Sequence, residues 1–352
     1  MPFKQRIEGL RTAMGAARAE AAVITSLPNV RYFCGFTGSN GALLVSRESV
    51  TLFTDPRYTI QAGQEAAAKV VVAKGPLEAA VVKKLGAFRR IAFENGRISF
   101  RSMVALQRAK GEWLGLDDTC EKLRMVKSEE EQAAIRASVD LNSAALAAAM
   151  PHFQVGMTET ELAAEIEYRM RRLGAEKAAF ETIVAFGKRS ALPHAHPGAA
   201  KITGRGLLLI DMGAFLNGYA SDMTRMAHVG AVPAQTRKLF KAVQEAQLAA
   251  IDRVRAGVTT ASVDAAARKV LDTHGYGEAF VHSTGHGLGL EIHELPRIGK
   301  KDKTRLEAGM AITIEPGAYL EGFGGVRIED TVLVTATGCE ILTPTSKNLM
   351  VL

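Results

Sequence analysis

The segment Leu207–Thr224, LLLIDMGAFLNGYASDMT, contains two acidic residues in a predicted strand pair. Its apolar beginning predicts a buried strand that ends at Asp211, and Asn217-Gly218 is typical of a two-residue hairpin turn. That turn would place Thr224 opposite Asp211 and Asp222 diagonal to Asp211 on the same face. Two carboxylates at one point of a protein interior need cations, so we expect bound metal ions.

Length, composition and cysteine content limit the class of protein. The 352 residues, 47% of them hydrophobic, suit one large core or two domains, and no apolar run is long enough to cross a membrane. The charged, amphipathic N-terminal segment is not typical of a secretory signal, and three widely spaced cysteines do not indicate a disulfide framework. We therefore expect a cytoplasmic protein without membrane partners.

The positive net charge belongs to the N-terminal third of the chain. Residues 1–126 carry 19 Lys and Arg against 11 Asp and Glu, whereas residues 127–352 carry 25 against 26. The basic residues are scattered singly and not interleaved with aromatic residues, which disfavours nucleic acid as a partner. A solvated basic face or a subunit contact is the expected meaning.

Two domains are predicted, at 1–126 and 127–352. The first alternates helical and strand patterns, with helices expected at 6–19, 77–85 and 100–109 and strands at 22–25, 42–46, 50–54, 70–73 and 90–93. At the boundary, Ser128 and Glu131 have the spacing of a capping box that starts an acidic helix. The N-terminal domain is therefore expected to have an α/β fold.

The second domain contains an internal repeat. The segments 155–158 and 256–259, each of which opens a predicted helix, lie 101 residues apart. Longer helices are expected before them, at 129–150 and 234–255. The same succession of elements, a helix, a second helix and a hairpin with acidic residues, thus occurs twice in this domain.

The acids of the two hairpins also recur at matched places. Glu315 follows Asp211 by 104 residues, and Glu329 follows Asp222 by 107. Acids can fall near strand ends by chance, but four at equivalent places in two half-copies make coincidence a poor explanation. Two facing halves would bring the four carboxylates to one centre.

A histidine-rich segment at 281–293, VHSTGHGLGLEIH, offers a fifth ligand. His282 and His286 have the spacing of a helical zinc pair, but three glycines disfavour a helix and no Glu follows His282. We therefore reject a zincin site. One imidazole, His286, is expected to join the carboxylates.

Asp211, Asp222, His286, Glu315 and Glu329 together offer four negative charges, which two divalent ions would neutralise. Oxygen-rich ligation with one imidazole favours Mn²⁺ or Co²⁺, with Fe²⁺ and Zn²⁺ as alternatives. Two such ions share a bridging water and lower its pKa. The predicted chemistry is hydrolysis.

Four segments resemble the signature segments of the pita-bread-fold metallopeptidase family, M24, which includes prolidase, aminopeptidase P and methionine aminopeptidase. They are DMGAFLNGYASDMTR (211–225), HSTGHGLGLEIHELPR (282–297), TIEPGAYL (313–320) and GGVRIEDTVLV (324–334). Residues 28–39 and 53–58 resemble the creatinase-type N-terminal domain, which methionine aminopeptidases lack. The resemblance implies a creatinase-type N-terminal α/β domain plus a pita-bread α+β catalytic domain with an internal pseudo-two-fold repeat.

The resemblance also implies roles for the five ligand candidates. Asp211 and Asp222 would bind one ion, His286 and Glu315 would bind the other, and Glu329 would help to bridge them. Glu315 is the implied proton carrier from the nucleophile to the leaving amine.

Further residues match family positions outside the metal site. His194 and His293 match histidines that contact the scissile carbonyl or stabilise the tetrahedral intermediate, and His282 matches another active-site histidine. His196 lies two residues from His194 in PHAHP and is the alternative, although the match favours His194. Candidate substrate-binding residues are Arg297, Arg327 and Tyr319. Arg297 would pair with a substrate carboxylate, and Arg327 is also a candidate for orienting a ligand carboxylate.

The expected function is that of an Xaa-Pro dipeptidase. A metal-bridging hydroxide would cleave the bond before a proline in the second position of a dipeptide or short peptide. The alternative is an Xaa-Pro aminopeptidase, aminopeptidase P, which acts on longer peptides. A creatinase-like C–N hydrolase and a non-catalytic binding protein are less favoured, because all five ligands are retained. A homodimer is expected by resemblance.

Overall fold

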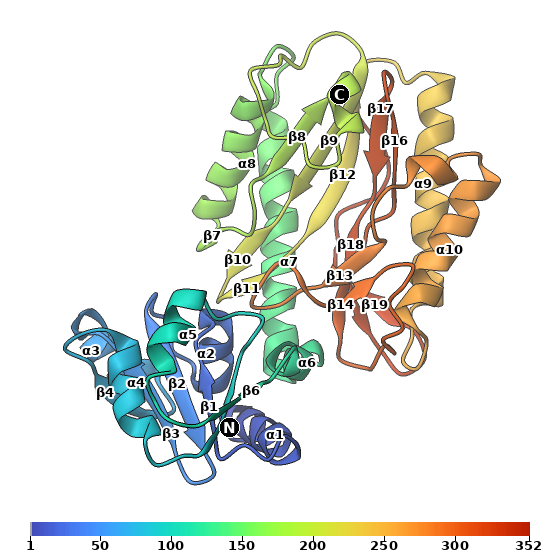
Figure 1. The fold of residues 1–352 in the computed structure, drawn as a ribbon. Helices are drawn as coiled ribbons and strands as arrows, with labels where there is room; N and C mark the ends of the chain where they lie inside the picture. The colour runs from blue at the N-terminus through green and yellow to red at the C-terminus, as the bar shows by residue number, and fades with distance from the viewer. Residues whose placement is uncertain (1) are drawn as a thin grey trace. The chain divides into compact units, whose positions relative to one another are not determined.

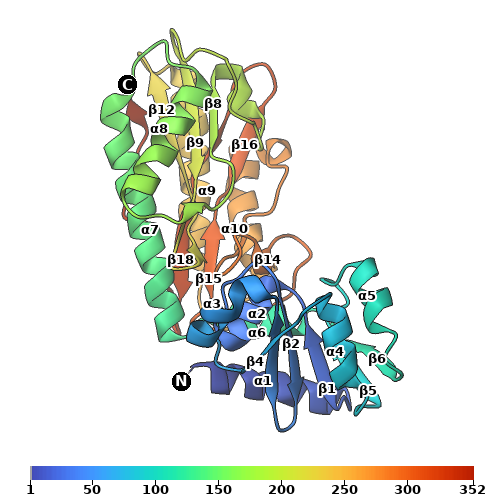
Figure 2. The same ribbon diagram turned by 90° about the vertical axis from the view of Figure 1, so that its left-hand side faces the viewer.

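The computed structural model describes residues 2–352 and divides the chain into two compact units, Met1–Arg124 and Met125–Leu352. Each unit contains its own sheets and hydrophobic core (Figures 1 and 2). Among the described residues, no helix combines the length and the apolar character that crossing a bilayer requires.

A six-stranded mixed sheet forms the centre of the N-terminal unit. In spatial order its strands are β4 (Lys69–Val72), β3 (Val50–Thr54), β2 (Gly41–Ser46), β1 (Ala21–Ile24), β5 (Arg90–Phe93) and β6 (Glu112–Gly115). The helices are α1 (Pro2–Ala16), α2 (Leu27–Cys34), α3 (Thr59–Glu65), α4 (Leu77–Leu85), α5 (Phe100–Leu106) and α6 (Thr119–Met125). Helices α4 and α5 contribute Val81, Leu85 and Leu106 to the core on one face of the sheet.

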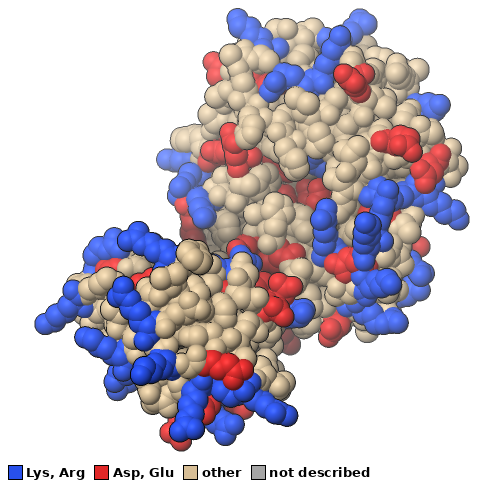
Figure 3. All heavy atoms as spheres, in the orientation of Figure 1, with Lys and Arg blue, Asp and Glu red and all other residues tan. Residues whose placement is uncertain are grey.

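The surface charge of this unit agrees with the sequence expectation. On the face shown in Figure 3, Lys and Arg are spread over the N-terminal unit, with Asp and Glu between them. No continuous basic stripe of the kind that follows a nucleic-acid backbone is visible on that face.

The C-terminal unit places two pairs of helices around several sheets. The first pair is α7 (Glu129–Ala149) and α8 (Glu159–Arg172), and the second is α9 (Ala234–Arg253) and α10 (Thr260–Thr273). One pair lies on each side of the strands (Figures 1 and 2). The starts of α8 and α10 lie 101 residues apart, which confirms the predicted repeat. The capping box of Ser128 and Glu131 at the start of α7 is also confirmed.

Two sheets belong to the first half of this repeat. A four-stranded sheet has the order β20 (Met350–Val351), β12 (Met223–Val229), β9 (Gly206–Met212) and β8 (Ile183–Phe186). A three-stranded sheet has the order β11 (Tyr219–Ala220), β10 (Ala214–Leu216) and β7 (Lys177–Ala178).

The second half also has two sheets. A five-stranded sheet has the order β14 (Glu294–Ile298), β13 (Gly285–Gly287), β15 (Ala311–Ile314), β18 (Asp330–Val334) and β19 (Cys339–Ile341). A separate ribbon pairs β16 (Gly317–Leu320) with β17 (Gly324–Arg327).

Strand β9 is apolar from Leu207 to Ile210 because both of its faces are buried. Leu208 and Ile210 pack in the core formed with α7 and α8, whereas Leu207 and Leu209 pack in the core formed with α9 and α10. Side chains alternate along a strand, so Asp211 shares the face of Leu207 and Leu209. Asp211 is thereby directed to the side on which the two halves meet.

Candidate metal centre

The predicted hairpin register is confirmed by the strand pairing. Leu216 pairs with Tyr219 across the turn, and Thr224 pairs with Asp211. Asn217 and Gly218 have φ angles of 52° and 76°, the positive values that this tight hairpin turn requires. The turn chemistry therefore fixes which residues face Asp211.

The second half brings its acids to the same region by a different connection. Glu315 directly follows β15, and its backbone N–H donates to the Thr284 carbonyl oxygen at 2.7 Å. Glu329 lies between β17 and β18, and its N–H donates to the Thr224 carbonyl oxygen at 3.3 Å. The latter bond joins the two halves beside the acids. Arg327 ends β17, so it does not share a strand with Glu329.

His286 lies on β13, and the glycines on either side of it are required by close backbone packing. A Cβ atom on Gly285 would lie 2.0 Å from the Thr313 carbonyl oxygen, and one on Gly287 would lie 2.2 Å from that of Leu295. This segment is a strand, which agrees with the rejection of a helical zinc pair.

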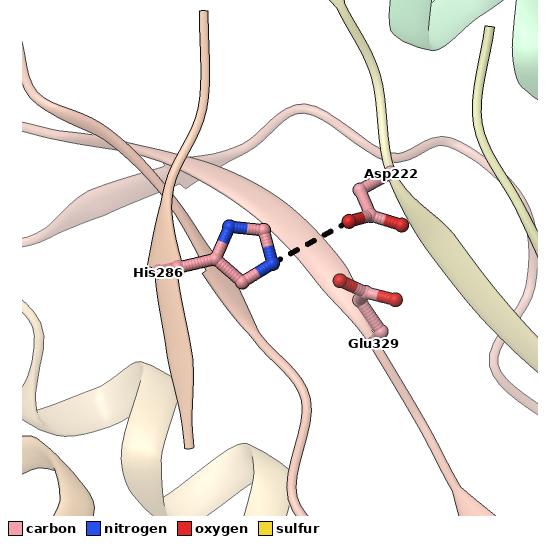
Figure 4. A group of neighbouring side chains, drawn as sticks. All are labelled: Asp222, His286 and Glu329. Carbon is pink, nitrogen blue, oxygen red and sulfur yellow. Dashed lines mark ion pairs between the residues drawn. The ribbon is translucent and has the colours of Figure 1, made fainter. Parts of the chain in front are cut away.

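Asp222, His286 and Glu329 converge, each offering one ligand atom within 4.8 Å of the others (Figure 4). His286 Nε2 lies 3.5 Å from Asp222 Oδ2 and 3.3 Å from Glu315 Oε1. Its Nδ1 lies 3.0 Å from the Gly287 carbonyl oxygen, so Nδ1 carries the proton and Nε2 presents a lone pair to the acids. This arrangement is typical of a metal-binding imidazole.

The acids fit a cation because the protein leaves them unsatisfied. Asp211 Oδ1 and Glu329 Oε1 are buried side-chain oxygens that have no hydrogen-bond partner among residues 2–352. Burial, together with the neighbouring carboxylates, raises the pKa values of Asp222 and Glu329 well above their usual range. Burial likewise raises the pKa of Glu315 to about 8. Divalent cations would satisfy these oxygens and favour the ionised carboxylates.

Asp211 is held at the edge of the cluster by Arg327. The Arg327 guanidinium donates to Asp211 Oδ2, to Tyr319 Oη at 2.7 Å and to the Pro193 carbonyl oxygen at 3.1 Å. Arg327 Nε donates to Thr224 Oγ1 at 3.0 Å. The guanidinium is thus engaged by protein groups, which is the arrangement expected of a residue that orients a ligand carboxylate.

His282 is linked to this network through Tyr319. Its Nε2 lies 2.9 Å from Tyr319 Oη, and its Nδ1 lies 2.8 Å from the Ser283 carbonyl oxygen. Burial and the Arg327 charge lower the pKa of His282 to about 4, so the imidazole is neutral. Tyr319 already accepts from Arg327, which leaves its hydroxyl proton free to be donated to His282.

The two histidines of PHAHP have different surroundings. His194 is exposed on its loop, and its charge contributes to lowering the pKa values of both His282 and His293. The His196 side chain is 80% exposed, and its Nδ1 lies 2.6 Å from Glu181 Oε2. The charge of His194 thus acts on His282 and His293, whereas His196 pairs with Glu181.

His293 and Arg297 follow His286 in the sequence and lie close to it. The His293 and His286 rings are 4.5 Å apart between centroids. Arg297 pairs with His286 across the β13–β14 ladder, so their side chains share a face of the sheet. Arg297 is exposed and forms no hydrogen bond or ion pair with the described residues.

Two threonines that hold the ligand candidates were not identified from the sequence. Thr224 Oγ1 donates to Glu329 Oε2 at 2.8 Å, and Thr313 Oγ1 accepts from the His286 backbone N–H at 3.1 Å. Both are fully buried strand residues. Thr224 had one available signal, since the hairpin register already placed it opposite Asp211.

Sequence and structure comparisons reveal extensive similarity to known proteins. The model of metallopeptidase family M24 matches residues 133–336, and that of the creatinase/prolidase N-terminal domain matches residues 6–126. An Xaa-Pro dipeptidase of Pyrococcus furiosus is 39% identical over 352 residues, which cover 99% of this chain and 100% of that protein.

Solved structures with this fold include enzymes of two specificities. The Xaa-Pro dipeptidase from Bacillus anthracis has a TM-score of 0.97 and 36% identity, with 99% of this chain and 100% of that chain covered. The X-Pro aminopeptidase from Thermotoga maritima MSB8 has a TM-score of 0.91 and 36% identity, with 97% and 100% covered.

Proposed function

Because the chain belongs to metallopeptidase family M24, we propose that it is a metal-dependent Xaa-Pro dipeptidase. It would release the first residue of a dipeptide whose second residue is proline. The observation that carries this proposal is the convergence of Asp222, His286 and Glu329 beside carboxylate oxygens that have no hydrogen-bond partner in the part of the chain that the structure describes. The similarity to Xaa-Pro dipeptidases extends over almost the whole chain, which supports the same conclusion.

Five side chains would hold two divalent ions: Asp211, Asp222, His286, Glu315 and Glu329. When bound, the ions would polarise the scissile carbonyl and activate a water molecule at neutral pH. Four carboxylates and one imidazole favour Mn²⁺ or Co²⁺. Glu315, whose Oε1 lies 3.3 Å from His286 Nε2, would carry a proton from the attacking water to the prolyl nitrogen as the bond breaks.

The histidines outside the cluster would act on the substrate. His194 and His293 would donate hydrogen bonds to the oxygen that becomes negatively charged during attack. Support comes from the proximity of His293 to His286, and from the influence of His194 on the pKa of His293. His282 would hold the Tyr319 hydroxyl, and Tyr319 would hold the Arg327 guanidinium. Arg327 in turn orients Asp211.

Arg297 supports a dipeptide substrate over a longer peptide. Its side chain shares a face with His286 and has no partner among the described residues. In an Xaa-Pro dipeptide, the proline carries a free carboxylate next to the scissile bond. A guanidinium is well suited to pair with that group.

The decisive assay compares three substrates that share the same scissile bond: Ala-Pro, Ala-Pro amide and Ala-Pro-Ala. Metal-stripped protein is assayed before and after addition of Mn²⁺ or Co²⁺, and release of alanine is measured. We expect metal-dependent cleavage with Ala-Pro as the preferred substrate. Preference for Ala-Pro-Ala would instead assign an Xaa-Pro aminopeptidase, and failure to cleave any of the three would reject both functions.

We also propose that the enzyme is a cytoplasmic homodimer. The three cysteines are free, which suits a reducing compartment. The homodimer rests on the resemblance of the N-terminal domain to domains that form subunit contacts. Light scattering coupled to size exclusion tests it, and a monomeric mass at assay concentration would reject it.

A further inference from the structure

A buried carboxylate outside the metal centre closes the loop that carries His194. Glu159 is the first residue of α8 and is 0% exposed. Its Oε1 accepts from the Phe186 N–H at 2.8 Å, at the end of β8, and its Oε2 accepts from the Gly198 N–H at 3.1 Å. A single carboxylate therefore ties both ends of residues 187–198, here called the His194 loop.

Arg189 connects this carboxylate to the backbone near the C-terminal end of the His194 loop. Its Nε lies 3.1 and 3.0 Å from the two Glu159 oxygens, and its Nη2 donates to the His196 carbonyl oxygen at 2.7 Å. The backbone is thereby held two residues beyond His194. The His194 side chain forms no hydrogen bond with the described residues, so its position depends on the backbone of the loop.

The second half of the repeat has the same backbone arrangement without the ion pair. Four backbone bonds link the start of α8 to residues 198–202, and four equivalent bonds link the start of α10 to residues 302–306. In the first half they are Gly156 N to Ile202 O, Ile202 N to Met157 O, Glu159 N to Ala200 O and Thr160 N to Gly198 O. In the second half they are Gly257 N to Leu306 O, Leu306 N to Val258 O, Thr260 N to Thr304 O and Ala261 N to Asp302 O.

At the position of Glu159, the second half has Thr260. Its hydroxyl donates to the Asp302 carbonyl oxygen at 2.9 Å. A hydroxyl is therefore sufficient to attach this backbone arrangement to its helix. At this position of the repeat, the buried carboxylate and its guanidinium belong to the half that carries His194. The buried pair of the second half, Asp264 with Arg268, lies four residues further along α10 and holds the Thr284 N–H and the His282 carbonyl oxygen instead.

We propose that Glu159 and Arg189 form a positioning clamp for His194. This inference rests on the proposed function, because it assigns the clamp to the step in which His194 contacts the substrate. Neither residue is placed in contact with the substrate or the metals. Holding the His194 loop in one conformation would keep the imidazole at the distance that transition-state binding requires, and small displacements at such positions reduce turnover strongly. If the pair were purely structural, its loss would lower stability, and the effect of that loss would not depend on whether His194 is present.

Arg189→Gln tests the clamp, because the Arg189 side chain is 39% exposed and its loss should not prevent folding. We expect kcat for Ala-Pro to fall on the order of tenfold or more, with KM and metal content little changed. In a His194→Ala background the same substitution should cause almost no further loss, since residues that act through one another are not additive. A full effect of Arg189→Gln in that background would overturn the proposal.

Arg136→Gln is the matched control. Arg136 also forms a two-bond ion pair, with Glu340, and its side chain is 41% exposed. Its replacement should leave kcat unchanged. If Arg136→Gln lowers kcat as much as Arg189→Gln, the loss does not come from the clamp.

Hydrogen exchange measured by mass spectrometry gives a readout that does not require activity. Arg189→Gln should speed exchange in a peptide covering the His194 loop but not in one covering residues 299–305. Unchanged exchange in the His194 loop would overturn the clamp even if Ala-Pro hydrolysis is observed. If the wild-type protein cleaves no Xaa-Pro substrate, the proposed function fails, and accelerated exchange would then show that the ion pair still holds the loop.

Discussion

The metal-free protein should lose stability as the pH rises from about 5 to about 8. Burial raises the pKa of Glu315 from its ordinary 4.5 to about 8, so the folded state holds this proton more tightly than the unfolded state does. Between these two pKa values the unfolded chain is ionised while the folded site stays protonated. Raising the pH through this window therefore favours unfolding.

The size of the effect follows from the Glu315 pKa. One pKa unit corresponds to about 1.4 kcal/mol, so this carboxyl alone should lower the free energy of unfolding by about 3 kcal/mol between pH 5 and pH 8. For a unit of this size, that corresponds to a decrease in Tm on the order of 10 °C. Asp222 and Glu329, whose pKa values are also raised, act in the same direction.

Thermal unfolding of chelator-treated protein, followed by circular dichroism at several pH values, measures this slope. Glu315→Gln is the control, because its amide cannot ionise, and its metal-free form should show a shallower decrease. Saturating Mn²⁺ should raise Tm more at pH 8 than at pH 5, since the ion binds the ionised carboxylates. The reasoning is refuted if wild type and Glu315→Gln have the same slope without metal.

Four substitutions test individual residues. Asp222→Asn should abolish Ala-Pro turnover, by roughly a thousandfold or more, while circular dichroism shows a retained fold; full metal-dependent activity would contradict its assignment as a ligand. His194→Ala should lower kcat by on the order of a hundredfold and His196→Ala less than about threefold, and the reverse ranking would mean that His196 is the catalytic imidazole. Arg297→Gln should raise KM for Ala-Pro roughly tenfold but leave Ala-Pro amide unaffected; an equal effect on both substrates would exclude pairing with the carboxylate.

The parts of the fold that could be predicted have strong local signals. Asn217-Gly218 fixed the hairpin register, and the capping box of Ser128 and Glu131 marked the start of α7. In the N-terminal unit, the short helices α2, α3 and α6 and the strand β6 were not predicted. Helix α2 is only eight residues long and has a proline in its first turn, and β6 is a partly exposed strand without alternating burial. Their formation depends on neighbouring elements more than on their own residue pattern.

The candidate site was predictable as a set of residues but not as a network of contacts. The recurrence of acids in two half-copies indicated which carboxylates would meet. It gave no indication that Arg327 would contact Asp211, because β17 ends at Arg327 and Glu329 lies in the connection that follows. Glu159 was equally inconspicuous, since an acid in the first turn of a helix is common and its partners lie 27 to 39 residues away.

The central claim is that five side chains from separate segments bind two divalent ions. Anomalous diffraction from crystals of the active, Mn²⁺-loaded enzyme tests it most directly. We predict two manganese peaks within bonding distance of the set formed by Asp211, Asp222, His286, Glu315 and Glu329. Crystals of active enzyme with no manganese peak at these residues would contradict the account.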